Sequence, residues 1–557
     1  MASLAKGSFH SSSTGKTRKP MFSTGEWGEG AVFDWYKSLQ NSSQAVLVNK
    51  LQVRIDRNQP PHRFVVAYLH GGVVCRFDRR PEEINPGKVL FETISRSRLK
   101  AADEFNHFLE NDPEYLLIQR STTCEIDLDL PPNTDVLLIL SACFALSRDT
   151  DASDYDLLTY NCYFFSWTIT MVVVRFVLPF RIPAANNIFQ TSTLAMNNLS
   201  DSITNKIIKA LLSIVLDVIA AARQTAGKRI QKGMYLCERV IWKLPTSAMC
   251  FLYKQALTLQ LYFGLEDTIR SKTHERMVQI CHKLLEDVLA QEGTAQKVEK
   301  RLWIHELKND IRNWFHTQMA STFWDAILDI IATVHGKVDG QQTLANIEAD
   351  PCRRSRIVVN LIGDAQWIQL WNEALSAALP AARDAVRERG SVLVTESSTQ
   401  LHNELFDIAF TAGSHAALSA AQNVVERTRP AQNNPKRDQM WETIWSVWDR
   451  MWSIANDRTR ATVVPIVEQA VEEIVTLVTH EVIANIRGGQ GQPAQSWVKY
   501  KKEKKTPLTA SSFQEHISHS VKSAYPTAGY RTDLIYSAMG RAWNDAVGVL
   551  QPGESGQ

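Results

Sequence analysis

The pattern of apolar residues changes near residue 185, and this change limits the possible folds more than any other feature. Short strand-like runs occupy 45–55, 63–69 and 73–77, and Gly71-Gly72 between the last two predicts a β-hairpin. From about residue 200, apolar residues recur at helical spacing and are interrupted by glycine- and proline-containing breaks. We therefore expect an α+β module followed by a large all-α region, in a chain that is mostly helical overall.

These patterns divide the chain into four expected parts. They are a flexible tail over 1–40, the α+β module over 41–185, a helical domain over 186–490, and a basic linker with C-terminal helices over 491–557. Within the module, we expect a short strand at 89–95 and a helical turn at 103–110, while 135–146 fits a strand or a helix equally well. The helices expected beyond the module include 267–291, 363–389, 396–427, 438–457 and 460–487.

Composition excludes several classes of protein. The 61 Lys and Arg residues nearly balance the 59 Asp and Glu residues, so charge gives no reason to expect a nucleic-acid partner. The eight cysteines form no Cys-x-x-Cys pair, which argues against a zinc ribbon and favours reduced thiols in a cytoplasmic protein. No apolar run reaches the length of about 18 residues that a transmembrane helix needs. We expect no metal, no cofactor and no transmembrane segment.

Two further motifs lie beyond residue 185, and each could be part of a surface for a partner. Trp441, Trp445, Trp448 and Trp452 recur at spacings of four, three and four, which places them on one face of a helix. We expect them to form a packing seam; the alternative is an exposed surface for a protein partner or lipid. The basic cluster over 499–505 is expected to be a solvated loop, with a nuclear signal or a phosphate contact as the alternatives.

Cys162 is the residue with the most specific chemistry. It stands where a polar segment gives way to an apolar helical stretch, and His62 precedes the strand-like run 63–69. The free N–H groups and positive dipole of a helix start stabilise a thiolate, and a neighbouring protonated imidazole stabilises it further. The alternative is that Cys162 is a small buried apolar residue, as free cysteines usually are.

Asn161-Cys162, followed by aromatic residues and preceded by Tyr155-Asp156-Leu157-Leu158, resembles the Asn-Cys motif of the circularly permuted papain-like group. That group includes the lecithin:retinol acyltransferase-like and PPPDE-type families and is related to the NlpC/P60 hydrolases. The resemblance covers roughly 50–180 and implies a papain-like module. In it, a histidine at a strand start precedes a cysteine at the start of a helix packed on a small antiparallel sheet. The stretch 160–167 also resembles a block found in proteins of mushroom-forming fungi, which implies no activity.

The resemblance assigns roles to individual residues. Cys162 is the expected nucleophile and His62 its base, with Asn161 and Tyr163 beside them as oxyanion or support residues. The acyltransferases carry a second polar residue, often a histidine, on the next strand, and no histidine lies in 73–78. Asp78 is our candidate for orienting the imidazole. The alternatives are Cys75 or a pair without a third residue.

The expected function is that of a thiol hydrolase or acyltransferase that acts on an amide, isopeptide or acyl ester of a protein or lipid. One alternative is a catalytically inactive helical interaction or scaffold protein that binds a protein partner through its helical region. A third possibility is a membrane-acting helical protein, which needs a large exposed apolar patch.

Overall fold

The computed structural model describes most of the chain as two compact units. The described residues are 21–22, 25–40, 45–57, 61–82, 99–234, 236–248, 251, 266–290, 292–337, 365–390, 398–432, 434–488, 496–501, 503–526 and 529–550. Unit 1 combines Met1–Ile182, Gln291–Asn309 and Ile483–Gln557, and unit 2 combines Pro183–Ala290 and Asp310–Val482. The expected 491–557 part thus belongs to the same unit as the sheet.

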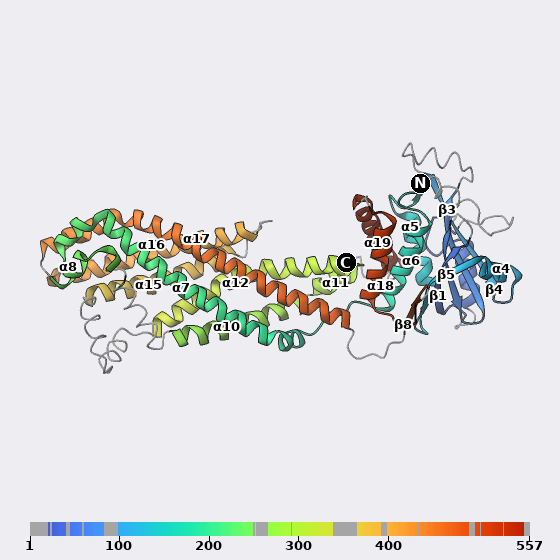
Figure 1. Ribbon diagram of the computed structural model, residues 1–557, viewed down its shortest axis with the longest axis horizontal. Helices are drawn as coiled ribbons and strands as arrows, with labels where there is room; N and C mark the ends of the chain where they lie inside the picture. Colours follow the sequence, from blue (N-terminus) through green and yellow to red (C-terminus); the bar gives the residue numbers. More distant parts are fainter. Residues whose placement is uncertain are drawn as a thin grey trace. The chain divides into compact units, whose positions relative to one another are not determined.

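Unit 1 is built on an eight-stranded antiparallel sheet (Figure 1). Its strands run in the order β6-β4-β3-β2-β1-β5-β7-β8. Their bounds are β1 Val48–Asp56, β2 Arg63–Leu69, β3 Val73–Pro81, β4 Leu99–Leu109, β5 Thr122–Asp129, β6 Asp154–Tyr155, β7 Trp497–Tyr500 and β8 Thr506–Pro507. The expected hairpin is present: Val65 pairs with Phe77, and Gly71 and Gly72 take φ values of 97° and 76° in its turn. Such left-handed values suit glycine, which has no Cβ.

Helices cover one face of this sheet in two layers (Figure 1). The inner layer is α5, Leu137–Arg148, and α6, Cys162–Val177, and the outer layer is α18, Ala510–Ala524, and α19, Gly529–Leu550. Both inner helices are buried almost all round, as expected for helices between two packing surfaces. The short helix α4, Pro113–Ser121, packs on the opposite face through Tyr115 and Ile118. This arrangement places the start of α6 beside the central strands.

The structure confirms the α+β and mostly helical fold class and corrects several local predictions. Residues 103–109 of the segment expected as a helical turn belong to strand β4, because β4 pairs along β3 from Pro81↔Ala101 to Val73↔Leu109. The ambiguous run 135–146 is helix α5. Residues 31–40, expected in the flexible tail, form helix α2, Ala31–Gln40, because Val32 and Phe33 are buried in the core of unit 1. The strand expected at 89–95 lies outside the described residues.

The basic cluster is also more ordered than a solvated loop. Its first residues lie in β7, which pairs with β5, and the side chain of Val498 is buried in the core. Lys505 forms an ion pair with Asp129. The lysine side chains at 499, 501, 504 and 505 remain exposed. Strand β7 covers only 497–500, which is too short to be predicted from the sequence without knowledge of its pairing with β5.

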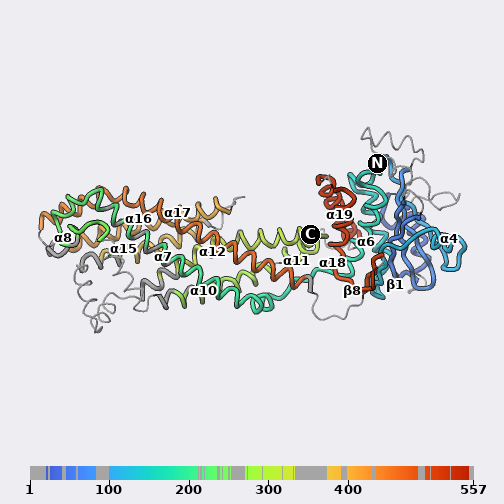
Figure 2. Tube along the Cα trace, viewed as in Figure 1, coloured from blue at the N-terminus to red at the C-terminus, as the bar shows by residue number. Residues whose placement is uncertain are grey.

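Unit 2 consists of long helices that run side by side (Figure 2). They are α7 Ala185–Gly233, α8 Leu236–Lys243, α10 Glu266–Ala290, the main part of α12 Ile304–Lys337, α15 Ala365–Gly390, α16 Ser398–Gln432 and most of α17 Pro435–Gly488; helix α11, Glu292–Lys300, belongs to unit 1. The helices predicted at 438–457 and 460–487 are one continuous helix, α17, with Pro465 inside it. Among the described residues, no helix has the length and apolar character to cross a membrane.

The four tryptophans of α17 form a packed row. Trp441 is 1% exposed in a core shared with α7, α15 and α16, and Trp445, Trp448 and Trp452 pack against that core while half-buried. Successive rings lie 5.7, 5.4 and 5.8 Å apart, within the range of favourable aromatic pairs. The row lies in unit 2, whereas Cys162 lies in unit 1.

Candidate active site

Asn161 fixes the position of Cys162 by capping helix α6. Its Oδ1 accepts hydrogen bonds from the backbone N–H groups of Tyr163, at 2.9 Å, and Phe164, at 3.2 Å. Its Nδ2 donates to the carbonyl of Leu157 at 2.9 Å. Cys162 is therefore the first residue of the helix, where the backbone N–H has no partner within the helix. The side chain of Asn161 shapes the helix start, and it is not left free to face a substrate.

His62 lies at the start of β2, where the sheet meets the beginning of α6. Its backbone carbonyl accepts from the N–H of Asp56 at 3.0 Å, which pairs it to the end of β1. Its ring lies near the ring of Phe64, with centroids 6.3 Å apart and planes tilted by 25°. The imidazole is only 1% exposed, so its charge depends on the groups that surround it.

Asp78, our candidate for orienting the imidazole, is hydrogen-bonded to it. Its Oδ1 is hydrogen-bonded to His62 Nε2, and its Oδ2 accepts from Arg76, at 2.6 and 3.0 Å, and from Arg80, at 2.9 Å. Burial alone would raise the pKa of Asp78, but Arg80 and Arg76, together with His62, hold that pKa well below its usual range. The buried carboxylate is therefore ionised and orients the ring.

Cys162 and His62 stabilise each other's charged forms. Burial would raise the pKa of the Cys162 thiol, but the positive charge of His62, with the backbone N–H of Arg63, holds it below its ordinary value. Burial would likewise lower the pKa of His62, but Asp78 and Cys162 raise it to about 9. Because Nε2 is bound to Asp78 and Nδ1 has no partner of regular hydrogen-bond geometry, Nδ1 is the ring nitrogen left to face the sulfur. Each charge therefore stabilises the other and shifts the pair towards a thiolate beside an imidazolium.

The other cysteines whose pKa is shifted differ from Cys162 in the direction of the shift. Burial raises the pKa of Cys75, Cys124, Cys143 and Cys281. Cys75 lies in the core on the helix-covered face and is not the group that orients the imidazole. Among these residues, Cys162 alone combines a helix start with an imidazole partner.

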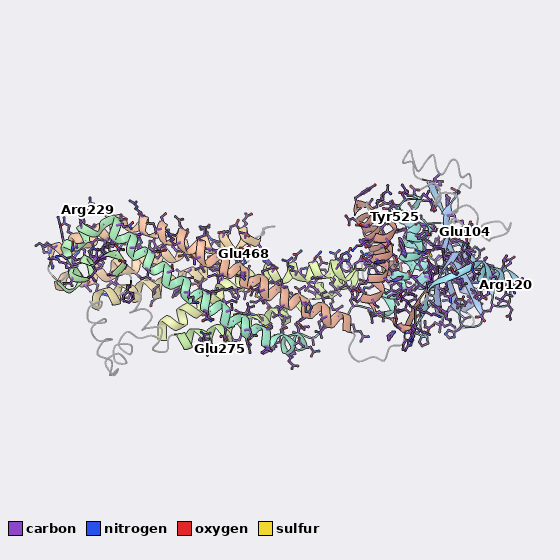
Figure 3. The ribbon with its side chains drawn as sticks, viewed as in Figure 1. Glu104, Arg120, Arg229, Glu275, Glu468 and Tyr525 are labelled. Atoms are coloured by element: carbon purple, nitrogen blue, oxygen red, sulfur yellow. The ribbon has the colours of Figure 1, made fainter. Side chains whose placement is uncertain are left out.

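The three residues are closed off from solvent. Cys162 is 2% exposed, and His62 and Asp78 are each 1% exposed. Tyr525, labelled in Figure 3, directly follows α18. Its hydroxyl accepts a hydrogen bond from Asn161 Nδ2 at 3.4 Å. Burial, and then the neighbouring negative charges of Asp156 and Cys162, raise the pKa of Tyr525 to about 12. A substrate can reach the sulfur only after a local rearrangement.

Tyr163 stands beside the triad and not within it. Its ring lies under the guanidinium of Arg63, 4.2 Å from the ring centroid, and Arg63 also pairs with Glu125 on β5. Its backbone N–H is taken by Asn161. Tyr163 therefore supports the wall of the site, and its backbone N–H is not left to bind an oxyanion.

Sequence reasoning missed Arg76, Arg80 and Tyr525. The sequence did indicate the two arginines. Residues alternate between the two faces of a strand, so Arg76 and Arg80 lie on the same face of β3 as Asp78. Sequence reasoning also missed Asp56, a buried carboxyl whose oxygens have no hydrogen-bond partner in the described chain and whose pKa is raised by burial. Tyr525 lies more than 360 residues from Asn161, and no local pattern links them.

Comparisons with known proteins add no assignment. No protein-family model matches the chain, and no curated protein or solved structure matches it either. The function therefore has to be argued from the geometry of the residues themselves.

Proposed function

We propose that the protein is a thiol hydrolase or acyltransferase that uses Cys162, His62 and Asp78 on an amide, isopeptide or ester. The observation that carries the proposal is that Asp78 is hydrogen-bonded to His62, and that the charge of His62 lowers the pKa of the Cys162 thiol at a helix start. A nucleophile, its base and an orienting carboxylate in this order form the usual arrangement for covalent acyl transfer. The order of His62 and Cys162 along the chain also agrees with the resemblance to the permuted papain-like group.

In this mechanism the Cys162 thiolate attacks the carbonyl carbon, and the backbone N–H of Cys162 stabilises the resulting oxyanion. His62 then donates its proton to the leaving nitrogen or oxygen as the carbon–heteroatom bond breaks, which leaves a thioester on Cys162. Water or an acceptor alcohol or amine next attacks the thioester, and His62 takes its proton. Collapse of this second adduct releases the acyl product and restores the thiolate and the imidazolium. Asp78 holds the ring throughout by its bond to Nε2.

Alkylation by iodoacetamide across pH 5 to 10 tests the ionic pair. We expect Cys162 to react with a rate that stays high below pH 7, because its thiol is already ionised there, whereas ordinary thiols lose about tenfold per pH unit below their pKa. The variant His62→Gln should restore ordinary pH dependence, and Cys162→Ser should remove the labelled peptide. Alkylation of the unfolded chain is the control, since there all thiols titrate near pH 8.5.

A catalytically inactive interaction protein is the second candidate, and the burial of the triad favours it. In that case the pair is an internal ionic contact inherited with the core. Two results would support this candidate over the enzyme. They are a Cys162 that is alkylated only at the rate of global unfolding, and a failure of thiol-directed vinyl-sulfone probes to label the folded chain.

A further inference from the structure

A cavity of about 450 Å³ lies at the far end of α6, within unit 1. Apolar and aromatic side chains supply most of its wall: Phe176, Phe180, Ile182, Trp543 and Val547. Arg175 is its one buried cation. A concave, mostly apolar space of this size with a few polar groups is typical of a small-molecule site. It lies 13 residues along α6 from Cys162, or about 20 Å at the rise of an α-helix, so it is separate from the thiol.

Arg175 is held rigidly at this cavity. Its guanidinium carbon lies 3.8 Å from the ring centroid of Phe180 and 5.0 Å from that of Trp543. Its Nε donates to the carbonyl of Arg301 at 3.0 Å, and its Nη2 donates to the carbonyl of Val298 at 3.0 Å. These carbonyls lie at the end of α11, so part of the guanidinium caps that helix.

Capping uses only part of the guanidinium. Nη1 carries two further N–H donors, makes no hydrogen bond to the described chain and is not sealed within it. Since Arg175 lines the cavity, Nη1 is the group that faces it.

No carboxylate of the described chain forms an ion pair with Arg175, although this side chain is only 3% exposed. Burial lowers its pKa to about 10, against the opposite effect of the exposed Glu299. A buried cation in this state is stabilised by any anion that reaches it.

We propose that this cavity binds a monocarboxylate with an apolar tail, of the medium-chain fatty-acid class. The carboxylate accepts from Nη1 of Arg175, and the tail contacts Phe176, Ile182 and Val547. The lining holds two cations, Arg175 and the exposed Arg181, and one carboxylate, the exposed Glu299, so its net charge of +1 (two minus one) matches a single negative charge better than a multiply charged phosphate. The proposal does not depend on the activity of Cys162.

Calorimetric titration of the full chain with octanoate tests the site. We expect saturable binding at one site, at least tenfold tighter than that of 1-octanol, and none of octylamine or acetate at the same concentrations. Binding to Cys162→Ala should equal binding to the unaltered chain. A loss of binding in that variant would place the carboxylate at the thiol and overturn the proposal.

A pair of variants separates charge from shape. Ala295 lines the cavity from an exposed position on α11 and takes no part in holding Arg175. We expect Ala295→Glu to weaken octanoate about fivefold through charge repulsion at the rim, whereas the isosteric Ala295→Gln changes it less than twofold. Arg175→Lys should weaken it at least tenfold, with folding checked by circular dichroism. Equal binding of octanol and octanoate, or equal effects of the Ala295 pair, would show that Arg175 is only a helix cap.

Discussion

Replacing Asp78 with asparagine tests whether this carboxylate sets the charge on His62. The change keeps the size of the side chain and one acceptor oxygen but removes the negative charge shared by His62, Arg76 and Arg80. Breaking one partner of a buried ion pair costs about 3–5 kcal/mol, because the other charge stays buried without compensation. We therefore expect Asp78→Asn to destabilise unit 1 by that amount. Hydrogen exchange of peptides from β2 and α6 measures the loss locally.

The same variant should change the chemistry of the thiol. Without Asp78, the pKa of His62 falls from about 9 and the imidazolium is lost near neutral pH, so the thiolate loses its partner. The charge of Asp78 itself opposes the thiolate, but this effect is smaller than that of His62. We expect the iodoacetamide rate at Cys162 to fall about tenfold at pH 6.5, equivalent to one unit in the thiol pKa.

Asp103→Asn is the matched control. Asp103 accepts from Nε and Nη2 of the fully buried Arg79, both at 2.7 Å, on the neighbouring strand pair. Its loss should destabilise unit 1 by a similar amount without moving the pH profile of Cys162. A folded Asp78→Asn chain with an unchanged profile would refute the argument that Asp78 controls the imidazole. An equal shift in Asp103→Asn would show that general loosening of the sheet, and not the charge of Asp78, governs the thiol.

Three further predictions concern stability. The folded-state pKa of His62, about 9 against 6.5, means that its contribution of on the order of 3 kcal/mol is complete below pH 6.5 and is lost as pH rises through 9. The stability gap between the unaltered chain and His62→Gln, followed by urea unfolding, should close over that range. Trp441→Ala removes a fully buried indole and should cost unit 2 about 3–5 kcal/mol, whereas Leu194→Ala, 75% exposed, should leave its urea midpoint unchanged. His402 is buried in unit 2, and burial, with the charge of His316, lowers its pKa to about 4. Unit 2 should therefore lose on the order of 3 kcal/mol as pH falls from 6.5 to 4, and His402→Gln should flatten that dependence.

Local patterns of sequence were sufficient for part of this structure. The Gly71-Gly72 turn with its flanking strands and the start of α6 at Cys162 follow from residues that are neighbours in the chain. The pairing of Asp78 with His62 was predictable because both belong to one hairpin. The identity of β4 was not, since its helix-like run becomes a strand only through pairing with β3.

Long-range features of the site left no local signal. Burial of the triad depends on packing of the whole unit, and Tyr525 reaches Asn161 from the opposite end of the chain. The row of tryptophans in α17 also shows how far local sequence patterns can predict the structure. Its spacing predicts a shared face, but only the tertiary structure shows that Trp441 is buried and that its three neighbours are half-buried.

The participation of 483–557 in unit 1 has a consequence for synthesis of the protein on the ribosome. Strand β7 and helices α18 and α19 emerge only after the roughly 300 residues that separate Ile182 from Ile483, which takes roughly 15–60 s at 5–20 residues per second. During that interval the edge of β5 has no strand beside it and the outer faces of α5 and α6 have no cover. During synthesis the nascent module therefore has an open sheet edge and two exposed apolar helices. A folding chain in this condition is prone to aggregate and needs a chaperone.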